Sequence, residues 1–419
     1  MGYDRRTRSA AETAVTVGYG FGERLTVAGS DIAFAPYGGY WRQLRKICAL
    51  ELFSAKRVQS FRSVREEEVS NLIALISSNK GLPINLGEML NNLTYSITLR
   101  SAFSGRRKQH EAFLSFLKKT LEELGLFSGV VDLFPSMKLL YWMSGTRKRH
   151  QRLHHDLDEM FERIIEEHRA NKANPKNGDE VTDDLIDVLL KLQDRGDLEF
   201  PLTTDNIKAV ILDILATGTD TSSTTIVWAM AEMMKNPRVM EKAQAEVRQI
   251  FDRTGEVNES NIHKSKYLNL VIKETLRLHP PVPLIPRENV ERCEIKGYEI
   301  PAKSKVLVNI WAIGREPNYW NEAERFNPER FLDSSIDYRG LNFEYIPFGG
   351  GRRICPGISF GMAVVELCLA NLLYLFDWKL PNGMKHEDLD MTEAFSATGK
   401  RKTDLCLIPI PYDAPCVEK

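Results

Sequence analysis

The stretch 347–357 reads PFGGGRRICPG, and an apolar run at 357–376 follows it directly. Consecutive glycines let the backbone take positive φ and approach a flat partner closely. A helix that begins after this loop would bring its positive dipole end near Cys355 and favour a thiolate. Arg353 can pair with an anionic group. The alternative is a glycine-rich turn with an incidental cysteine, but five residues share one fixed spacing: Phe348, Gly351, Arg353, Cys355 and Gly357.

The composition is that of a large folded protein. The chain has 419 residues, of which 43% are hydrophobic and 27% are charged, which argues against disorder. The formal net charge of −1 does not suggest a nucleic-acid binder. The six cysteines form no C-x-x-C pair, so neither a disulfide framework nor a zinc site is predicted.

The hydrophobic periodicity predicts a mainly α fold with a minor β part. The longest helix is expected at 202–235, with Thr203 or Thr204 as its N-cap and Pro237 ending it. Further helices are expected at 60–78, 150–171, 237–252 and 266–279, a polar loop at 174–182, and strands at 293–311 and 405–411.

The apolar run at 357–376 is long enough to resemble a membrane span. It contains Glu366 and Asn371 and is apolar on all sides, so we expect a buried core helix instead. No apolar core of a signal peptide occurs in residues 1–16.

The middle of the longest predicted helix is polar. Residues 217–225 read TGTDTSSTT, and such residues compete with the helix for backbone hydrogen bonds. This segment predicts a local distortion at a functional place, the alternative being a weak helix without a function.

The stretch 347–357 resembles the haem-binding loop F-x-x-G-x-R-x-C-x-G of the cytochrome P450 superfamily. The resemblance implies the cytochrome P450 fold, with haem b between the long central helix and the helix after the loop. It makes Cys355 the axial thiolate ligand of the iron, with cofactor contacts from Phe348, Arg353 and Gly357. A thiolate ligand favours cleavage of a bound O–O bond.

Three further motifs follow the same family pattern. Glu274 and Arg277 resemble the E-x-x-R pair, and Arg330 resembles the third member of its buried network. Residues at i and i+3 lie on one helix face, where they can meet. Residues 217–221 resemble the oxygen-activation segment [A/G]-G-x-[D/E]-T. In that segment Gly218 leaves room beside the cofactor.

The resemblance gives Asp220 and Thr221 the catalytic role of passing protons to the distal oxygen. Thr217 stands where the family usually has Ala or Gly, which adds a hydroxyl near the substrate pocket. Trp41 and Arg45 resemble the W-x-x-x-R contact to a haem propionate, the alternative being a basic surface helix. Arg287 also fits a propionate partner.

The resemblance covers about 31–412 and is closest to plant microsomal clan 71, in its terpenoid-oxidising, 71D-like group. It implies a monooxygenase that inserts one atom of O2 into a hydrophobic small molecule. Electrons would come from NADPH through the NADPH-cytochrome P450 reductase. A basic surface for that partner is expected from Arg42, Lys46, Lys56, Arg57 and Arg352, although a solvated charged face explains them equally well.

The resemblance also predicts where substrate binds. The pocket is expected from 207–221, 282–285 and 395–398, with a flexible roof at 124–131. Its candidate lining residues are Thr217, Val282, Ile285 and Phe395. Core packing is the alternative for each of them, and apolar side chains suit a terpenoid or a fatty acyl chain alike.

The start of the chain departs from the family pattern. Residues 1–24 stand where relatives have a membrane anchor, a hinge and the first strands, so we expect an atypical segment there and a monooxygenase domain at 25–419. The resemblance implies the cytosolic face of the endoplasmic reticulum, here without the anchor. The alternatives are an inactive haem-binding remnant, an oxidase of fatty acids or alkaloids, or a reductase-independent catalyst of hydroperoxide rearrangement.

Overall fold

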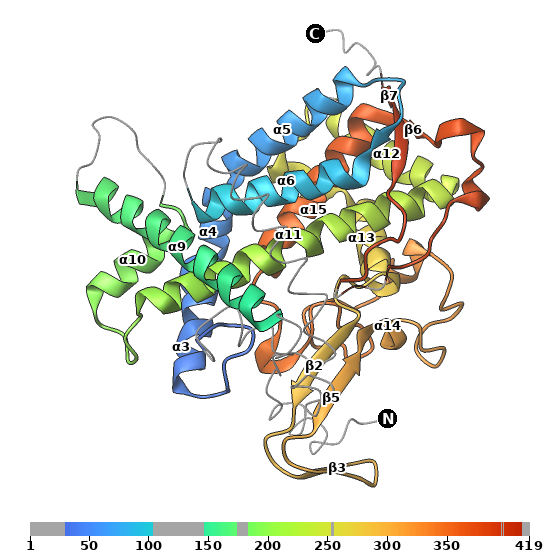
Figure 1. Ribbon diagram of the computed structural model, residues 1–419. Helices are drawn as coiled ribbons and strands as arrows, with labels where there is room; N and C mark the ends of the chain where they lie inside the picture. Colours follow the sequence, from blue (N-terminus) through green and yellow to red (C-terminus); the bar gives the residue numbers. More distant parts are fainter. Residues whose placement is uncertain are drawn as a thin grey trace. The chain divides into compact units, whose positions relative to one another are not determined.

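The computed structural model describes residues 30–103, 146–173, 183–252, 255–394, 396 and 398–412. The predicted loop at 174–182, the predicted roof at 124–131, residues 1–24 and Phe395 lie outside these residues. The chain forms two compact units. The first contains 1–60, 98–217 and 286–307, and the second contains 61–97, 218–285 and 308–419. Helices α6 (Leu86–Ala102) and α11 (Thr204–Lys235), both labelled in Figure 1, each have residues in both units.

The first unit combines helices with a small β part. Its other helices are α3 (Gly39–Ile47), the π-helix Cys48–Leu52, α4 (Ala55–Ser60), α9 (Thr146–Ala173) and α10 (Leu185–Arg195). Helix α10 begins with a capping box, in which Asp184 accepts from the Asp187 N–H at 2.9 Å. It ends at Gly196, which takes the left-handed conformation with φ 63°.

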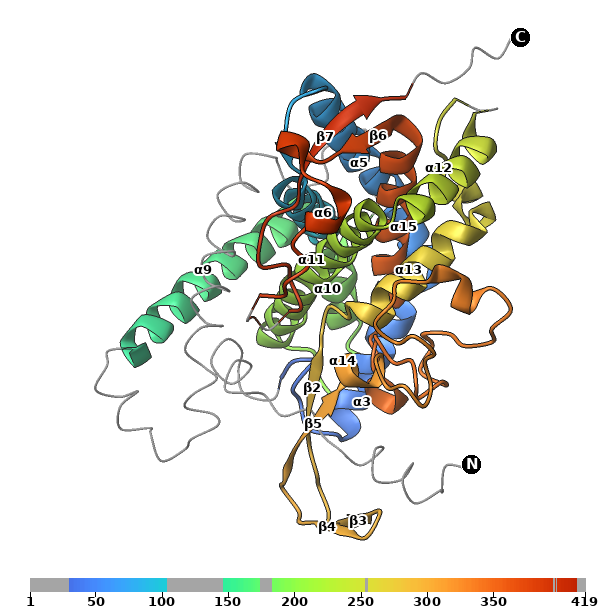
Figure 2. The ribbon, with the colours of Figure 1, turned by 90° about the vertical axis from the view of Figure 1, so that its right-hand side faces the viewer.

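The strands of this region confirm the prediction for 293–311 as far as residue 309, whereas Ile310 and Trp311 belong to a short helix. Strand β2 (Leu284–Glu288) pairs with β5 (Lys305–Asn309), and β3 (Cys293–Ile295) pairs antiparallel with β4 (Tyr298–Ile300). The β3–β4 turn uses Lys296 and Gly297, both at positive φ, which suits a tight two-residue hairpin. Figure 2 shows this hairpin beyond the end of the β2–β5 pair.

The second unit is organised around helix α15 (Ile358–Leu375). Helices α5 (Arg62–Ser78), α12 (Pro237–Phe251) and α13 (Lys266–Leu278) contact α15, as Figures 1 and 2 show. Most of the α15 side chains are buried, among them Val365, Leu369 and Leu372. By length and composition α15 alone among the described helices could cross a membrane, but 61% of its apolar window is buried inside the molecule. The predicted core helix is confirmed.

The second unit also holds the larger sheet and several short helices. Its strand order is β1 (Ile84–Asn85), β7 (Cys406–Pro411) and β6 (Phe376–Lys379), all antiparallel. The prediction for 405–411 is thus confirmed as a strand, but its partners come from distant segments. The short helices are Glu259–Lys264, α14 (Ile310–Ile313), Pro328–Phe331, Gly351–Arg353, Pro381–Gly383 and His386–Asp388.

Helix α11 runs over almost the full predicted range. Thr203 caps it, because the Thr203 hydroxyl accepts from the Asn206 N–H at 3.2 Å while the Asn206 side chain accepts from the Thr203 N–H at 2.9 Å. The polar segment 217–225 does not interrupt the helix, contrary to the predicted distortion. The hydroxyls of Thr217 and Thr225 donate to carbonyls one turn earlier, at 2.7 and 2.9 Å, so they bond within the helix.

Candidate active site

The cysteine loop has the backbone conformation that its glycines predict. Gly349 and Gly351 have φ of 74° and 68°, values that glycine adopts without strain. The Cys355 N–H donates to the Phe348 carbonyl at 3.0 Å, which closes the loop. Gly357 then serves as the N-cap of α15. The loop therefore places Cys355 two residues before the helix cap, beside the positive end of the helix dipole.

Cys355 differs from the buried cysteines of the described chain. Its side chain is exposed, whereas Cys48 and Cys368 are buried. Burial raises the pKa of Cys48 to about 12 and raises that of Cys368 still further, so both stay protonated. Cys406 is also exposed, but it lies on strand β7 and not at a helix end. Cys355 is therefore the described thiol best placed to become a metal-binding thiolate.

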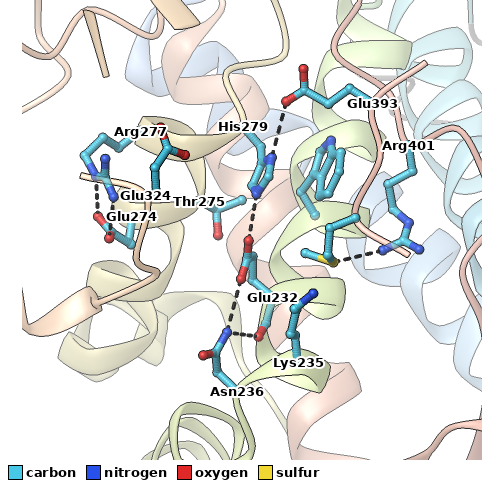
Figure 3. A network of polar contacts seen from close by, with 12 residues as sticks. Glu232, Lys235, Asn236, Glu274, Thr275, Arg277, His279, Glu324, Glu393 and Arg401 are labelled. Atoms are coloured by element: carbon cyan, nitrogen blue, oxygen red, sulfur yellow. Dashed lines mark hydrogen bonds and ion pairs between the residues drawn. The ribbon is translucent and has the colours of Figure 1, made fainter. Parts of the chain in front are cut away.

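Glu274, Arg277 and Arg330 meet as the motif predicts. Arg277 donates to both oxygens of Glu274 at 2.8 Å, and Arg330 donates to Oε1 of Glu274 at 2.9 Å. The Glu274 and Arg277 side chains are fully buried, and Figure 3 shows this pair. The opposite charges and the two hydrogen bonds between them offset the cost of removing both side chains from water.

The network also binds a long segment of backbone, which sequence reasoning missed. Arg277 donates to the carbonyls of Gly314 and Ala323, and Arg330 donates to that of Asn321. At Gly314 an added Cβ would lie 2.3 Å from the Arg277 carbonyl oxygen, so this close approach requires glycine. The three charged residues therefore hold α13 against the segment 314–330.

The candidate oxygen-activation residues lie together near the middle of α11. Asp220 and Thr221 are partly exposed, and Thr217 is exposed one turn earlier. The Asp220 carboxylate forms an ion pair with Lys400, with 2.7 Å between Oδ2 and Nζ. Sequence reasoning missed Lys400, because no motif connects the two distant positions.

In the first unit, Trp41 and Arg45 share one face of α3 as predicted. The Trp41 indole is buried and donates to the Ile32 carbonyl at 3.0 Å. The Arg45 guanidinium lies 5.7 Å from the Trp41 ring centre. Arg287 donates to the Pro286 carbonyl at 2.9 Å, and burial lowers its pKa to about 10. Arg45 and Arg287 therefore supply two positively charged side chains, and the Trp41 indole is fixed by its hydrogen bond.

Two other predictions, the basic docking surface and the lining of the substrate pocket, agree with the structure only in part. Arg42, Lys46 and Lys56 are exposed as a docking surface requires, but Arg57 donates to the carbonyls of Glu51 and Asp183. Arg57 therefore has a structural role within the first unit. Val282 and Ile285 are partly exposed. Packing in the core therefore does not fully explain why apolar side chains stand at these two positions.

The family model described as Cytochrome P450 matches residues 19–407, which is most of the chain. This chain belongs to the cytochrome P450 family. It is 55% identical over 387 residues to desmethyl-deoxy-podophyllotoxin synthase of Sinopodophyllum hexandrum, covering 92% of this chain and 76% of that protein. It is 54% identical to premnaspirodiene oxygenase of Hyoscyamus muticus, covering 91% and 76%.

Cytochrome P450 71D11 of Lotus japonicus is 54% identical, covering 91% of this chain and 78% of that protein. A zebra fish cytochrome P450 with abiraterone has the same fold, with a TM-score of 0.79 at 23% identity, covering 97% of this chain and 89% of that one. The predicted fold class and the 71D-like plant clan are confirmed.

Membership of the family establishes the type of chemistry. The protein is a haem-thiolate monooxygenase that acts on a small hydrophobic molecule with O2 and takes electrons from a redox partner. Its cofactor is haem b, and NADPH supplies the electrons indirectly through a reductase. Plant members of the family are generally membrane-bound. The described residues fit haem by their donor chemistry: the exposed Cys355 thiol suits iron, and arginines suit the carboxylates.

Proposed function

We propose that the Cys355 thiolate is the axial ligand of the haem iron. The observation that carries this proposal is the exposed Cys355 side chain in a closed glycine loop, two residues before the cap of α15. Phe348 and Gly357 would form the wall of the ligand site on either side of it. A bound haem supplies the one-electron and oxygen chemistry, and the protein supplies the thiolate and its surroundings.

We propose that Arg45, Arg287 and Arg353 hold the carboxylates of the haem, with Trp41 fixing the position of Arg45. Burial lowers the pKa of Arg287, so an anionic partner would offset the desolvation of this cation. Guanidinium groups bind carboxylates through two parallel hydrogen bonds, which gives orientation as well as charge compensation.

We propose that Asp220 and Thr221 bring protons to the oxygen-binding side of the haem, while Gly218 leaves space there. Both side chains are partly exposed on a helix that is otherwise largely buried. A carboxylate and a hydroxyl on adjacent residues can pass a proton from water into an apolar pocket. Glu274, Arg277 and Arg330 support the site from a distance by holding the backbone around 314–330.

We propose that the substrate is a terpenoid, that the electron donor is the NADPH-cytochrome P450 reductase, and that the enzyme works at the cytosolic face of the endoplasmic reticulum. The resemblance to premnaspirodiene oxygenase supports the substrate class. Val282, Ile285, Phe395 and Thr217 are the proposed lining residues. An alkaloid is the second candidate, because tabersonine 16-hydroxylase 2 of Catharanthus roseus is 52% identical.

The iron ligand is tested by the absorption spectrum of the reduced protein under carbon monoxide. We expect a Soret band at the long wavelength typical of thiolate ligation, lost in Cys355→Ala and kept in the control Cys406→Ala. A long-wavelength band that survives in Cys355→Ala would contradict the assignment. A band only at the shorter wavelength of the inactive form in the unmodified protein would favour the inactive haem-binding remnant.

The substrate class and donor are tested by turnover of the holoenzyme with the reductase and NADPH. Product formation from a terpenoid hydrocarbon, but not from a fatty acid or an indole alkaloid, would support the proposal. Conversion of a fatty-acid hydroperoxide without reductase would show the rearrangement chemistry instead.

A further inference from the structure

The proline segment, residues 280–285, leads from α13 to two proposed pocket side chains, Val282 and Ile285. Three of its first four residues are prolines, and a proline ring fixes φ, so little rotation is left in this stretch. Just before it, the His279 N–H closes α13 by donating to the Thr275 carbonyl at 2.7 Å. The way in which His279 is held therefore sets the direction of the chain towards the pocket.

The His279 ring is attached to helix α11 by its face and by one nitrogen. It stacks on the Trp228 indole, with ring centres 3.8 Å apart and planes 3° apart. Its Nε2 lies 2.8 Å from Oε1 of Glu232. Trp228 and Glu232 are one helical turn apart and share a face of α11. All three side chains are buried, and Figure 3 shows His279 between Glu232 and Glu393.

Trp228 holds a second segment at the same time. Its indole N–H donates to the Gly399 carbonyl at 2.6 Å. The Gly399 N–H donates in turn to the Pro281 carbonyl at 3.0 Å. A Cβ at residue 399 would lie 3.0 Å from the Pro280 carbonyl oxygen, so the two backbones are in close contact. Trp228 and His279 together therefore fix the proline segment against Gly399.

The second ring nitrogen of His279, Nδ1, is buried and makes no hydrogen bond within the described part of the chain. Oε1 of Glu393 lies 3.6 Å from it. Burial raises the pKa of Glu393, but its contacts with His279 and Trp311 outweigh burial and lower this pKa, so Glu393 is anionic at neutral pH. In a neutral ring with its proton on Nε2, the lone pair of Nδ1 faces this carboxylate. In a protonated ring Nδ1 becomes a second donor, and the positive charge lies between two carboxylates.

Glu393 belongs to the same loop as Gly399. It forms a backbone bridge with Arg401, two residues after the glycine. A contact between His279 and Glu393 therefore acts on the loop that carries Gly399. Charged groups surround the ring from each element packed against it: Glu232 from α11, Glu393 and Arg401 from this loop, and Arg315 from the segment after α14, whose charge acts on Glu393.

We propose that His279 is a positioning residue of the substrate pocket, and that its protonation closes the contact between Nδ1 and Glu393 and holds the Gly399 loop against the proline segment. The proton comes from water and returns to water, and no bond other than N–H changes. Histidine changes its charge in the neutral pH range. The pocket wall is therefore fixed at low pH and looser at high pH. This inference rests on the proposed lining of the pocket by Val282 and Ile285.

The first test measures amide hydrogen exchange of the peptide that contains Gly399, in the haem-loaded protein. At pH 6 we expect Glu393→Gln to lower the protection of this peptide about fivefold, the factor typical of one lost hydrogen bond. Glutamine keeps the size of the side chain and an oxygen that can accept from Trp311, but it carries no charge. At pH 9, where His279 is neutral, the two proteins should have equal protection.

The control for this test is Glu387→Gln, at an exposed carboxylate of the second unit, which should exchange as the unmodified protein does. Unchanged protection in Glu393→Gln at pH 6 would overturn the proposal. A loss of equal size at pH 6 and pH 9 would show a structural role without protonation, and would overturn it as well.

The second test determines whether the pocket responds. Imidazole and 4-phenylimidazole bind haem iron through the same kind of ring nitrogen, and only the phenyl group extends to the pocket wall. Their dissociation constants follow from shifts of the Soret band in the holoenzyme. In His279→Gln we expect the preference for 4-phenylimidazole over imidazole to fall about fivefold at pH 6, and to match that of the unmodified protein at pH 9. The titration of the probes themselves is the same in both proteins.

The matched control for the binding test is His263→Gln, at an exposed histidine of the second unit, which should keep the original preference. Glu393→Gln should give the same loss as His279→Gln, and it replaces that variant if His279→Gln does not fold. An unchanged preference at pH 6 in the folded variants would overturn the proposal.

Ile285→Ala separates this inference from the proposed function. If Ile285→Ala leaves the preference for 4-phenylimidazole unchanged, the proposed lining fails and the inference with it. If Ile285→Ala lowers the preference but His279→Gln and Glu393→Gln do not, only the inference is overturned. If all three lower it, and the effects of the latter two disappear at pH 9, the role of His279 is supported.

Discussion

At the scale of single residues, the structure contains a fully buried pair of opposite charges, Glu274 and Arg277. Glu274 accepts from Arg277, from Arg330 and from the Asn327 N–H at 2.8 Å, so its lone pairs are used within the protein. A carboxylate with so many donors is stable without water. Removing its charge would leave buried arginine charge without compensation.

We therefore expect Glu274→Gln to lower the free energy of unfolding by about 3–5 kcal/mol, the usual cost of breaking a buried pair by removing one partner. Urea unfolding measures this. The control is Glu322→Gln in the exposed pair with Arg325, where both side chains retain over 60% of their exposure. That change should cost less than about 1 kcal/mol, and equal effects of the two variants would contradict the assigned role of Glu274.

Asp213 gives a residue-level prediction about pH. Its carboxylate accepts from the N–H groups of Ile32 and Ala33 at 2.8 and 3.1 Å, but burial and the neighbouring Asp31 raise its pKa to about 8. A raised pKa means that the folded state binds the proton more tightly, so this group contributes stability that is lost as pH rises from about 4 to about 8.

In Asp213→Asn we expect the urea midpoint to fall less between pH 6 and pH 8 than in the unmodified protein. Asn keeps an oxygen that can accept the two backbone bonds but does not ionise. Asp205→Asn, at an exposed carboxylate in the first turn of the same helix, is the control and should keep the original slope. Identical slopes in all three proteins would refute the prediction.

At the scale of elements, caps and side-chain bonds decide where helices meet. Asp184 caps α10 and also contacts His168 of α9, with 2.8 Å between its Oδ2 and the His168 Nε2. The other ring nitrogen of His168 lies 2.7 Å from the Ile164 carbonyl. Burial lowers the pKa of His168, but the bonds to Asp184 and Ile164 outweigh it and raise the pKa to about 9.

The His168–Asp184 contact predicts a stability change in alkaline solution. A raised histidine pKa contributes stability that is complete below about 6.5 and is lost as pH rises through about 9. In His168→Gln we expect this loss between pH 7 and pH 9.5 to disappear, as measured by thermal unfolding across that range. Replacing the exposed His155 of the same helix with Gln should leave the pH dependence in place.

At the scale of the whole molecule, we expect the cofactor to add to the stability of the fold. A ligand that binds only the folded state stabilises it by RT ln(1 + [L]/Kd). We expect the haem-depleted protein to unfold at lower urea concentration than the haem-loaded protein, and Cys355→Ala to reduce that difference. Calorimetry or circular dichroism measures it. Equal midpoints with and without haem would show that the cofactor does not contribute to stability.

Much of the helical architecture could be predicted from local patterns. The periodicity of 202–235 and its flanking Thr203 and Pro237 defined α11, and the apolar run at 357–376 defined α15. Such signals are local, because hydrophobic spacing and caps lie within the element itself. The prediction of a distortion at 217–225 was wrong. Helix propensity does not include the hydrogen bonds that threonine hydroxyls donate to carbonyls of the same helix.

The sequence by itself indicated the candidate site positions: the thiol loop at Cys355, the Glu274–Arg277 pair, and Asp220 with Thr221. They are short motifs whose spacing reflects one loop or one helix face. Only the tertiary structure decided the long-range partners: β7 pairs with β1 and β6, Arg57 bonds to the Asp183 carbonyl, and Lys400 reaches Asp220. Such contacts depend on which distant segments packing brings together, and no local pattern records that.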